Sequence, residues 1–409
     1  MSAPLNPKPS GNAVQLSTEL IHHPYTPPAG FEAVQPGVHR ASTVIFPTVA
    51  ALRNRDWKHK TGYTYGLHGT PTTFTLEERI ATLEGGRFCT LVPSGLAAVV
   101  LVGMALLKAG DEVLIPDNAY GPNKAFAESE LEGWGISHQF YDAMNPADLA
   151  ARLHSKTRLV WLEAPGSITL EFPDLRQLIA VIKLHAARHP EGIVTALDNT
   201  WGAGIAFRAF DLGVDISVQA LTKYPSGGAD VLMGSVVTSK QALHQLVSLC
   251  NMRVGYGVGG NDAELVLRGL ASMAVRYAAQ DANTRALAGW LQAQPQVEAV
   301  LHPAIASSPG HESWKRDCSA AACLLSVVFR PAYSQAEVDG FCDRLKLFRL
   351  GYSWAGPMSL CAPYNVPAIR TAPWSRKGGL VRFSIGLEAL ADLQADLAQS
   401  LAAMQYSKA

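Results

Sequence analysis

The chain has 409 residues, which is long enough for two or three domains. Hydrophobic residues make up 48% and charged residues 17% of it, which is typical of a protein with a large apolar core and excludes wholesale disorder. The 34 basic and 34 acidic residues cancel, and no basic stripe is present, so we expect no nucleic acid partner.

The N-terminal residues lack the charged and apolar segments of a signal peptide. The longest apolar run, residues 91–107, is interrupted by proline, serine and glycine, so we expect a buried helix there and no membrane span. The six cysteines are scattered without a Cys-x-x-Cys pair. We therefore expect reduced thiols, a cytoplasmic location and no metal site.

Residues 1–64 have many prolines and weak periodicity, which predicts an extended arm that packs on another body, such as a second subunit. A helix is predicted to begin at a capping box of Thr75 and Glu78 and to end at Gly85. A strand at 88–92 follows it, and then a long apolar helix that ends near residue 110.

The turn between that strand and that helix reads Pro93-Ser94-Gly95-Leu96. A small Ser-Gly corner at a helix N-terminus can bind a phosphate through backbone N–H groups and the helix dipole. Many ordinary strand-to-helix turns contain the same residues, so the corner is weak support by itself.

Strands and helices then alternate, which predicts an α/β fold with a mostly parallel sheet covered by helices over residues 65–268. From about residue 269 a smaller α+β unit, 269–409, is predicted. The predicted strands are 112–116, 136–141, 157–162, 193–197, 214–221, 231–238, 323–329 and 380–385, and the predicted helices are 147–153 (capped by Asn145), 174–188, 335–345 and 390–404.

A literal G-x-G-x-x-G occurs at Gly255, Gly257 and Gly260. A helical stretch precedes it, whereas a dinucleotide-binding loop follows a strand. We therefore interpret it as the loop before a long helix at 262–293.

Asp198 ends one predicted strand, and Lys223 follows the next one. In open parallel sheets, ligands bind at the carboxyl ends of the strands, so both side chains are expected in one pocket. Pyridoxal phosphate needs a lysine for its Schiff base and an acid that keeps its ring nitrogen protonated. Alternatively, Lys223 is a solvated loop lysine and Asp198 a helix cap, and the surrounding motifs decide between these readings.

Six motifs surround this pair in a fixed order: EAPGSIT (163–169), LDNTWGAG (197–204), QALTKYPSGGAD (219–230), GHESWKRD (310–317), YSWAG (352–356) and RFSIGLE (382–388). On these motifs the chain, from about residue 18, resembles the Cys/Met-metabolism family of pyridoxal-phosphate enzymes, and within it the β-lyase branch. The resemblance implies the fold-type-I architecture, which is a mostly parallel seven-stranded sheet with helices on both faces and a smaller C-terminal α+β domain.

The resemblance also implies roles for single residues. Lys223 would form the Schiff base and later move the Cα proton, and Asp198 would pair with the ring nitrogen. The remaining cofactor contacts would come from Gly95, Leu96 and Thr222 at the phosphate, Tyr120 stacked on the ring and Ser167 near the ring hydroxyl.

For the substrate, the resemblance implies that Arg382 binds the carboxylate with help from Ser353 and Trp354. A bidentate guanidinium suits a carboxylate, and an arginine in an apolar strand is costly without a purpose. Tyr65 would reach in from a neighbouring subunit of a homotetramer that is built from dimers sharing their active sites. The plainer readings are a structural ion pair for Arg382, a core or interface position for Tyr65 and Tyr120, and a space-filling role for Trp354.

The sequence departs from the family pattern at three positions. Leu67, followed by His68, stands where an arginine usually contacts a neighbour's cofactor phosphate. Ala220 stands where many relatives have serine, and Met358 stands where the family often has glutamate. We expect the first change to weaken cofactor binding and the last to affect the distal part of the substrate.

The implied reaction is β-elimination of L-cystathionine to homocysteine, pyruvate and ammonia, as in methionine biosynthesis and transsulfuration, with Lys223 or Tyr65 protonating the leaving sulfur. Three alternatives stay open: a γ-lyase or γ-synthase, a lyase for cysteine or other cysteine thioethers, and a cofactor-binding regulatory protein. No appended DNA-binding domain or charged tail supports the last of these.

Overall fold

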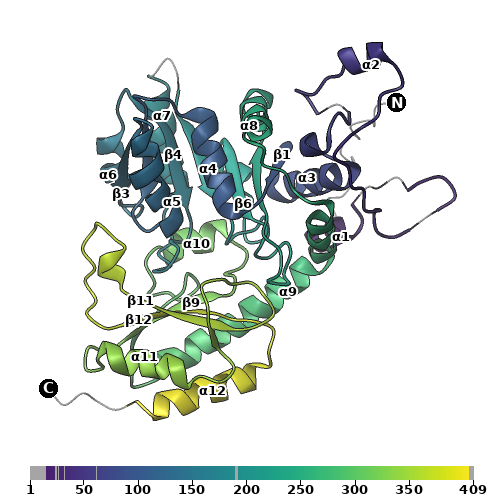
Figure 1. Ribbon diagram of the computed structural model, residues 1–409. Helices are drawn as coiled ribbons and strands as arrows, with labels where there is room; N and C mark the ends of the chain where they lie inside the picture. The colour runs from purple at the N-terminus through teal and green to yellow at the C-terminus, as the bar shows by residue number, and fades with distance from the viewer. Residues whose placement is uncertain are drawn as a thin grey trace.

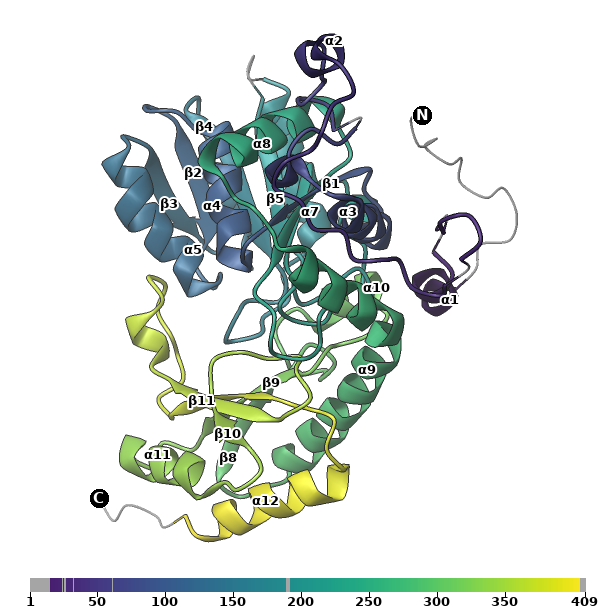
Figure 2. The same cartoon turned by 45° about the vertical axis from the view of Figure 1, so that its right-hand side comes forward.

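The computed structural model describes residues 15–23, 25, 27–31, 33–60, 62–188 and 192–404. It contains two sheets, and helix α9 (Gly260–Gln292) runs from the larger sheet to the smaller one (Figures 1 and 2). In the part described, no helix is both long enough and apolar enough to cross a membrane.

The larger sheet has seven strands in the order β1-β7-β6-β5-β4-β2-β3, and only β7 runs antiparallel to its neighbours. The predicted mostly parallel sheet is therefore confirmed. Its strands are β1 (Phe88–Val92), β2 (Glu112–Pro116), β3 (Ser137–Tyr141), β4 (Thr157–Glu163), β5 (Val194–Asp198), β6 (Ile216–Ala220) and β7 (Gly234–Thr238).

Both faces of this sheet are covered by helices because its apolar side chains alternate between two cores. On β2, Leu114 belongs to one core, whereas Val113 and Ile115 belong to the other. The first core includes α3 (Pro71–Glu84) and α7 (Leu175–Ala186) and lies on the side of α6 (Pro146–Arg152), and the second includes α4 (Gly95–Leu106), α5 (Gly121–Phe126) and α8 (Gln241–Val254).

The smaller sheet has the order β10-β11-β12-β9-β8, and one of its faces packs on the end of α9 and on two further helices. Val381 and Phe383 of β12 point into that core, so Arg382 between them points to the opposite face. The elements are β8 (Val297–Leu301), α10 (His311–Asp317), β9 (Leu324–Phe329), α11 (Gln335–Arg344), β10 (Arg349–Leu350), β11 (Leu360–Tyr364), β12 (Leu380–Ser384) and α12 (Leu390–Ala402).

The predicted start of the first long helix is wrong. Helix α3 begins at Pro71, and Thr70 is its N-cap: the Thr70 hydroxyl accepts from the Thr73 N–H at 3.3 Å, and the Thr73 hydroxyl accepts from the Thr70 N–H at 2.8 Å. Thr75 lies one turn further along the helix, where its hydroxyl donates to the Pro71 carbonyl. Proline at the first helical position and a reciprocal threonine pair take the place of the expected Thr-x-x-Glu box.

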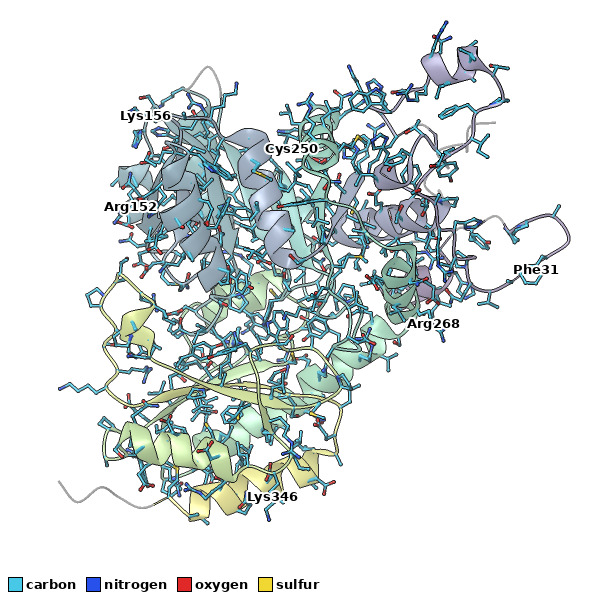
Figure 3. All side chains as sticks on the ribbon, viewed as in Figure 1. Phe31, Arg152, Lys156, Cys250, Arg268 and Lys346 are labelled. Carbon is cyan, nitrogen blue, oxygen red and sulfur yellow. The ribbon has the colours of Figure 1, made fainter. Side chains whose placement is uncertain are left out.

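The segment before α3 lies at the edge of the molecule, and residues 1–14 are outside the described part. Helix α1 (Leu16–Ile21) packs near α3 and α9, whereas α2 (Val49–Arg53) lies away from the body (Figure 1). Phe31, 67% exposed, sits in a loop that projects outward (Figure 3). That this arm contacts another subunit stays a prediction, as does the division at residue 268, which falls inside α9.

Tyr224 joins the larger sheet to the C-terminal part of the chain. Its buried hydroxyl accepts a hydrogen bond from the Cys323 N–H at 2.9 Å, and its ring lies 4.3 Å from the Tyr277 ring of α9. The loop that holds Lys223 is thereby tied to the start of β9.

We predict that Tyr224→Phe lowers the free energy of unfolding by about 1–3 kcal/mol, because it leaves the buried Cys323 N–H without an acceptor. Urea unfolding measured by fluorescence checks this. Tyr256→Phe is the matched control, since the Tyr256 hydroxyl forms no hydrogen bond within the described chain, and it should change stability little. Equal stability of the two variants would contradict the prediction.

Candidate active site

A cavity of about 660 Å³ lies at the carboxyl ends of the parallel strands, with walls from both sheets. The structure brings ten of the predicted site residues together around it. They are Gly95, Leu96, Tyr120, Ser167, Asp198, Thr222, Lys223, Ser353, Trp354 and Arg382. Tyr65 is the one predicted residue that does not line this cavity within a single chain.

Asp198 is the last residue of β5, and its side chain is half-buried at the cavity wall. Its Oδ1 accepts from the Thr200 N–H at 3.0 Å and from the Thr200 hydroxyl at 2.6 Å. Burial raises the pKa of Asp198, while the Thr200 hydrogen bonds and the Lys223 charge oppose that rise. A half-buried carboxylate at a strand end that faces a cavity is suited to pair with a cationic group of a ligand.

Glu163, the last residue of β4, lies beside Asp198 in the sheet register. Its Oε2 accepts from the Tyr120 N–H at 2.8 Å. Burial and then the Asp198 charge raise the pKa of Glu163 well above its ordinary value, which favours the protonated form of this carboxyl group. Sequence reasoning gave this residue no role, although it ends a predicted strand just as Asp198 does.

Lys223 projects into the same cavity. Its Nζ donates to the Ser353 hydroxyl at 2.9 Å and lies 5.4 Å from the centre of the Trp354 ring. Burial, followed by the nearby Arg382 charge, lowers the pKa of Lys223 from 10.5 to about 8. A lysine with this pKa is partly neutral near physiological pH and can act as a nucleophile or a base.

The start of α4 has the donors that a phosphate needs. The Ser94 side chain and carbonyl accept from the N–H groups of Ala97 and Ala98, at 3.0 and 3.1 Å. Among the hydrogen bonds of the described chain, none uses the Gly95 and Leu96 amides, which the helix itself cannot satisfy.

Two neighbours complete this corner. A Cβ added to Gly95 would lie 2.6 Å from the Ala220 Cβ, so only glycine permits the close approach of α4 to the end of β6. The Thr222 hydroxyl is bonded to the Met233 backbone, at 3.2 Å to the N–H and 3.3 Å to the carbonyl. To contact a phosphate, this hydroxyl would turn its proton away from the Met233 carbonyl.

Arg382 is 6% exposed and forms no ion pair within the described residues. Its guanidinium donates to the carbonyls of Ser167 and Tyr352, both at 3.0 Å, and lies 5.2 Å from the centre of the Tyr364 ring. Within the described residues, Arg382 is therefore not part of the structural ion pair that was the alternative interpretation. Two neutral acceptors fix the group and leave its charge available for an anion in the cavity.

Tyr120 precedes α5, and its side chain lines the cavity at 39% exposure. Burial and the carboxylates of Asp198 and Glu163 raise its pKa, so its hydroxyl stays protonated. The exposed ring faces the space beside Asp198 and Lys223, where a planar ligand could stack on it.

A further group at the rim was not predicted. Arg370 donates to Glu171 at 2.6 Å and lies 3.6 Å from an Asp117 carboxylate oxygen. Asp117, which follows β2, accepts from the N–H groups of Thr371 and Ala372. Burial alone would raise the pKa of Asp117, but these bonds and Lys124 lower it to about 2. Its position after a predicted strand was the available signal.

The residues at the three departures lie apart from the cavity, except Ala220. Leu67 and His68 belong to a short 3-10 helix (Gly66–His68) next to Tyr65, which is 46% exposed. Met358 is also exposed and does not line the cavity of this chain. The contribution of Tyr65 from a neighbouring subunit stays a prediction.

Comparison with known proteins places this site in a family. The family described as Cys/Met metabolism PLP-dependent enzyme matches residues 17–402. The chain is 39% identical over 393 residues to a putative cystathionine β-lyase of Rhizobium johnstonii, covering 95% of this chain and 96% of that one. It is 35% identical over 388 residues to the cystathionine β-lyase MetC of Escherichia coli K12, covering 94% and 97%.

Solved structures agree on the fold. The metB protein of Corynebacterium glutamicum superposes with a TM-score of 0.87 at 27% identity, covering 96% of this chain and 99% of that one. The cystathionine γ-synthase of Xanthomonas oryzae pv. oryzae, crystallised with aminoacrylate and cysteine, gives 0.86 at 28% identity, covering 95% and 98%.

The chain therefore belongs to the Cys/Met-metabolism family of pyridoxal-phosphate-dependent enzymes and has the fold-type-I architecture. It is a pyridoxal-phosphate-dependent lyase of that family. The residues present fit the cofactor: a lysine of lowered pKa, a half-buried carboxylate at a strand end and a helix start with a glycine face one cavity.

We predict that Gly95→Ala weakens cofactor binding at least about tenfold, because the added methyl pushes the Gly95 and Leu96 amides away from the phosphate. Titration of the apoprotein with pyridoxal phosphate, followed by absorbance, measures the change. Gly121→Ala is the control: Gly121 also lines the cavity, but its Cβ would meet no atom within 4 Å. Loss of affinity in both variants to the same degree would refute the steric argument.

We also predict that covalent capture of the cofactor by Lys223 accelerates with rising pH up to about 8 and then levels off. Only the neutral amine attacks an aldehyde, and a pKa lowered by burial brings the plateau down from 10.5. Stopped-flow absorbance over a pH series tests this, with N-acetyl-lysine as the reference for the intrinsic titration of the cofactor. The same pH profile for protein and reference would disprove the lowered pKa.

Proposed function

We propose that this enzyme catalyses β-elimination from L-cysteine thioethers, with L-cystathionine as a substrate and homocysteine, pyruvate and ammonia as products. The observation that carries the proposal is the unpaired, buried Arg382 in the same cavity as Lys223, because together they can hold an α-carboxylate and reach the adjacent Cα–H. Relatives that are 34–39% identical are named cystathionine β-lyases, which supports the β reaction.

In this proposal the protein fixes the substrate at its carboxylate and controls one proton. Arg382, oriented by the Ser167 and Tyr352 carbonyls, binds the carboxylate. Asp198 keeps the ring nitrogen of the cofactor protonated. When bound, pyridoxal phosphate supplies an electron-accepting ring that stabilises negative charge at Cα.

Lys223 is the base in the proposed mechanism. The hydrogen bond to the Ser353 hydroxyl orients its amine, and its lowered pKa provides the neutral form that removes the Cα proton. The resulting ammonium, or Tyr65 from a neighbouring subunit, returns a proton to sulfur as the Cβ–S bond breaks. Water then converts the three-carbon fragment to pyruvate and ammonia.

A second candidate is a β-lyase that prefers cysteine thioethers with an uncharged substituent. The distal wall of the cavity contains Tyr352, Tyr364 and Ile369. The cation at this rim, Arg370, is already paired with Glu171 and Asp117. Among the described lining residues, no unpaired charge remains there for the second amino-acid group of cystathionine.

We further propose a cytoplasmic homotetramer whose paired subunits share their active sites through Tyr65. The exposed apolar side chains of the arm, which include Phe31 and Ile45, support burial against another copy. Sedimentation of the cofactor-loaded protein would give its mass in solution.

We predict pyruvate and homocysteine, in equal amounts, when the loaded enzyme meets L-cystathionine. Lactate dehydrogenase coupling and chromatography of the thiols check this, and Lys223→Ala is the inactive control because it lacks the base. 2-Oxobutyrate with cysteine would instead show γ-elimination. A higher kcat/KM with S-alkyl-cysteine than with cystathionine would favour the second candidate. If neither substrate gave a keto acid, the proposed β-elimination from cysteine thioethers would be wrong.

A further inference from the structure

A buried polar cluster lies under the cofactor site, on the opposite face of the larger sheet. Asp198 points into the cavity, and Asn199, the next residue, points away from it. On β6, Ser217 and Gln219 are fully or almost fully buried and alternate with residues that line the cavity. These side chains surround the carboxylate of Glu84, the last residue of α3.

Glu84 is 0% exposed and accepts several hydrogen bonds. The Asn199 amide donates to both carboxylate oxygens at 3.2 and 3.0 Å, the Ser217 hydroxyl donates at 2.8 Å, and the Gln219 amide also donates. No basic side chain forms an ion pair with Glu84 in the described chain. A carboxylate buried at the C-terminal end of a helix, without a cation, is costly in free energy.

Among the described residues, the charged and titratable groups near enough to act on the Glu84 carboxyl are Asp198, on the other side of the sheet, Arg208 and the Cys89 thiol. Burial raises the pKa of Glu84 to about 7, against the hydrogen bonds from Asn199 and Ser217. Asp198 raises it further, and Arg208 lowers it. Glu84 therefore gains or loses its proton near neutral pH, and part of that balance depends on the charge of Asp198.

We propose that Glu84 is a positioning residue that responds to the charge of Asp198 from behind the sheet, so that cofactor binding and ionisation of Glu84 are coupled. The proposal rests on the role of Asp198 as partner of the ring nitrogen. In the apoprotein the two carboxyl groups repel, and Glu84 retains its proton. Pairing of Asp198 with a protonated ring removes the repulsion, and Glu84 releases the proton.

The coupling is reciprocal. If cofactor binding favours the ionised form of Glu84, then the ionised form binds the protonated ring more tightly. Folding of the apoprotein responds to this ionisation in the opposite direction. A carboxyl group whose pKa is raised in the folded state loses its contribution to the free energy of unfolding as the pH rises through that pKa. Above about pH 7, ionised Glu84 thus lowers the folding stability of the apoprotein, and it favours cofactor binding.

Proton release on cofactor binding tests the proposal without relying on turnover. Calorimetric titration of the apoprotein with pyridoxal phosphate, in buffers of different ionisation enthalpy, counts the protons released at each pH. The wild type should release more protons than Glu84→Gln. The difference should be largest near pH 7 and vanish well below and well above it, where Glu84 has the same charge in both states.

The substitution can be accommodated in this cluster. Asn199 Oδ1 and Gln219 Oε1 have no hydrogen-bond partner among the described residues. Rotation of either amide presents an acceptor to the new side-chain NH2 group.

Glu112→Gln is the matched control. Glu112 is also buried in the same sheet, with hydrogen bonds from Gln139 at 2.9 Å and Thr157 at 3.2 Å and a His154 nitrogen at 2.7 Å, but it starts β2, at the end far from the cavity. Its proton count should equal that of the wild type. Asp198→Asn should remove the extra protons while Glu84 is still present.

Ser217→Ala gives a second test if Glu84→Gln does not fold. It removes one donor to the carboxylate, so the maximum of proton release should move to higher pH. Equal counts for wild type and Glu84→Gln at every pH, or an unmoved maximum in Ser217→Ala, would overturn the proposal. Failure of the β-elimination assay would not affect these counts, because they need only cofactor binding.

Discussion

Buried charge with too few partners is the constraint on which this site depends. Lys223 and Arg382 are cationic groups in a cavity where each meets mainly neutral acceptors, and the half-buried Asp198 and Glu163 lie side by side. Each ion costs several kcal/mol to bury without a counterion. The protein meets this cost by shifting the pKa values and by leaving charges that a phosphorylated, cationic ring and a carboxylate can neutralise.

It follows that the empty protein holds more unfavourable electrostatic energy than the loaded one. Binding of cofactor and substrate then supplies counter-charges to groups that are already in place, and the geometry needs little adjustment. The strands fix these groups: Asp198 and Glu163 end β5 and β4, Lys223 lies in the loop after β6, and Arg382 lies in the middle of β12.

Much of this arrangement was predictable because it is local in sequence. The strands before Asp198 and Lys223 are short apolar runs, and the carboxyl ends of parallel neighbours share one edge of the sheet. The long helix after the G-x-G-x-x-G stretch was also predicted, because a helix and not a strand precedes it. The start of α3 was misplaced because Thr70 and Thr73 imitate a capping box without an acidic residue.

The parts that escaped prediction depend on partners distant in the chain. Nothing near Arg382 in sequence shows that the carbonyls of Ser167 and Tyr352 hold it. The bond of Asp117 to Thr371 spans 254 residues. Glu84 looks like an ordinary polar end of an amphipathic helix, and only the hydrogen bonds of its side chain to Asn199 and to Ser217 of β6 show that it is buried beneath the site.

The unbroken course of α9 has a consequence for stereochemistry. Because one continuous helix of 33 residues links the two sheets, the separation between Arg382 and Lys223 is set by the scaffold before any ligand arrives. The carboxylate and the amine of an α-amino acid are then held at two fixed points. In this arrangement only one of the two enantiomers has its Cα hydrogen directed toward Lys223. The scaffold thus selects the configuration at Cα, whereas the residues at the rim of the cavity select among substrate side chains.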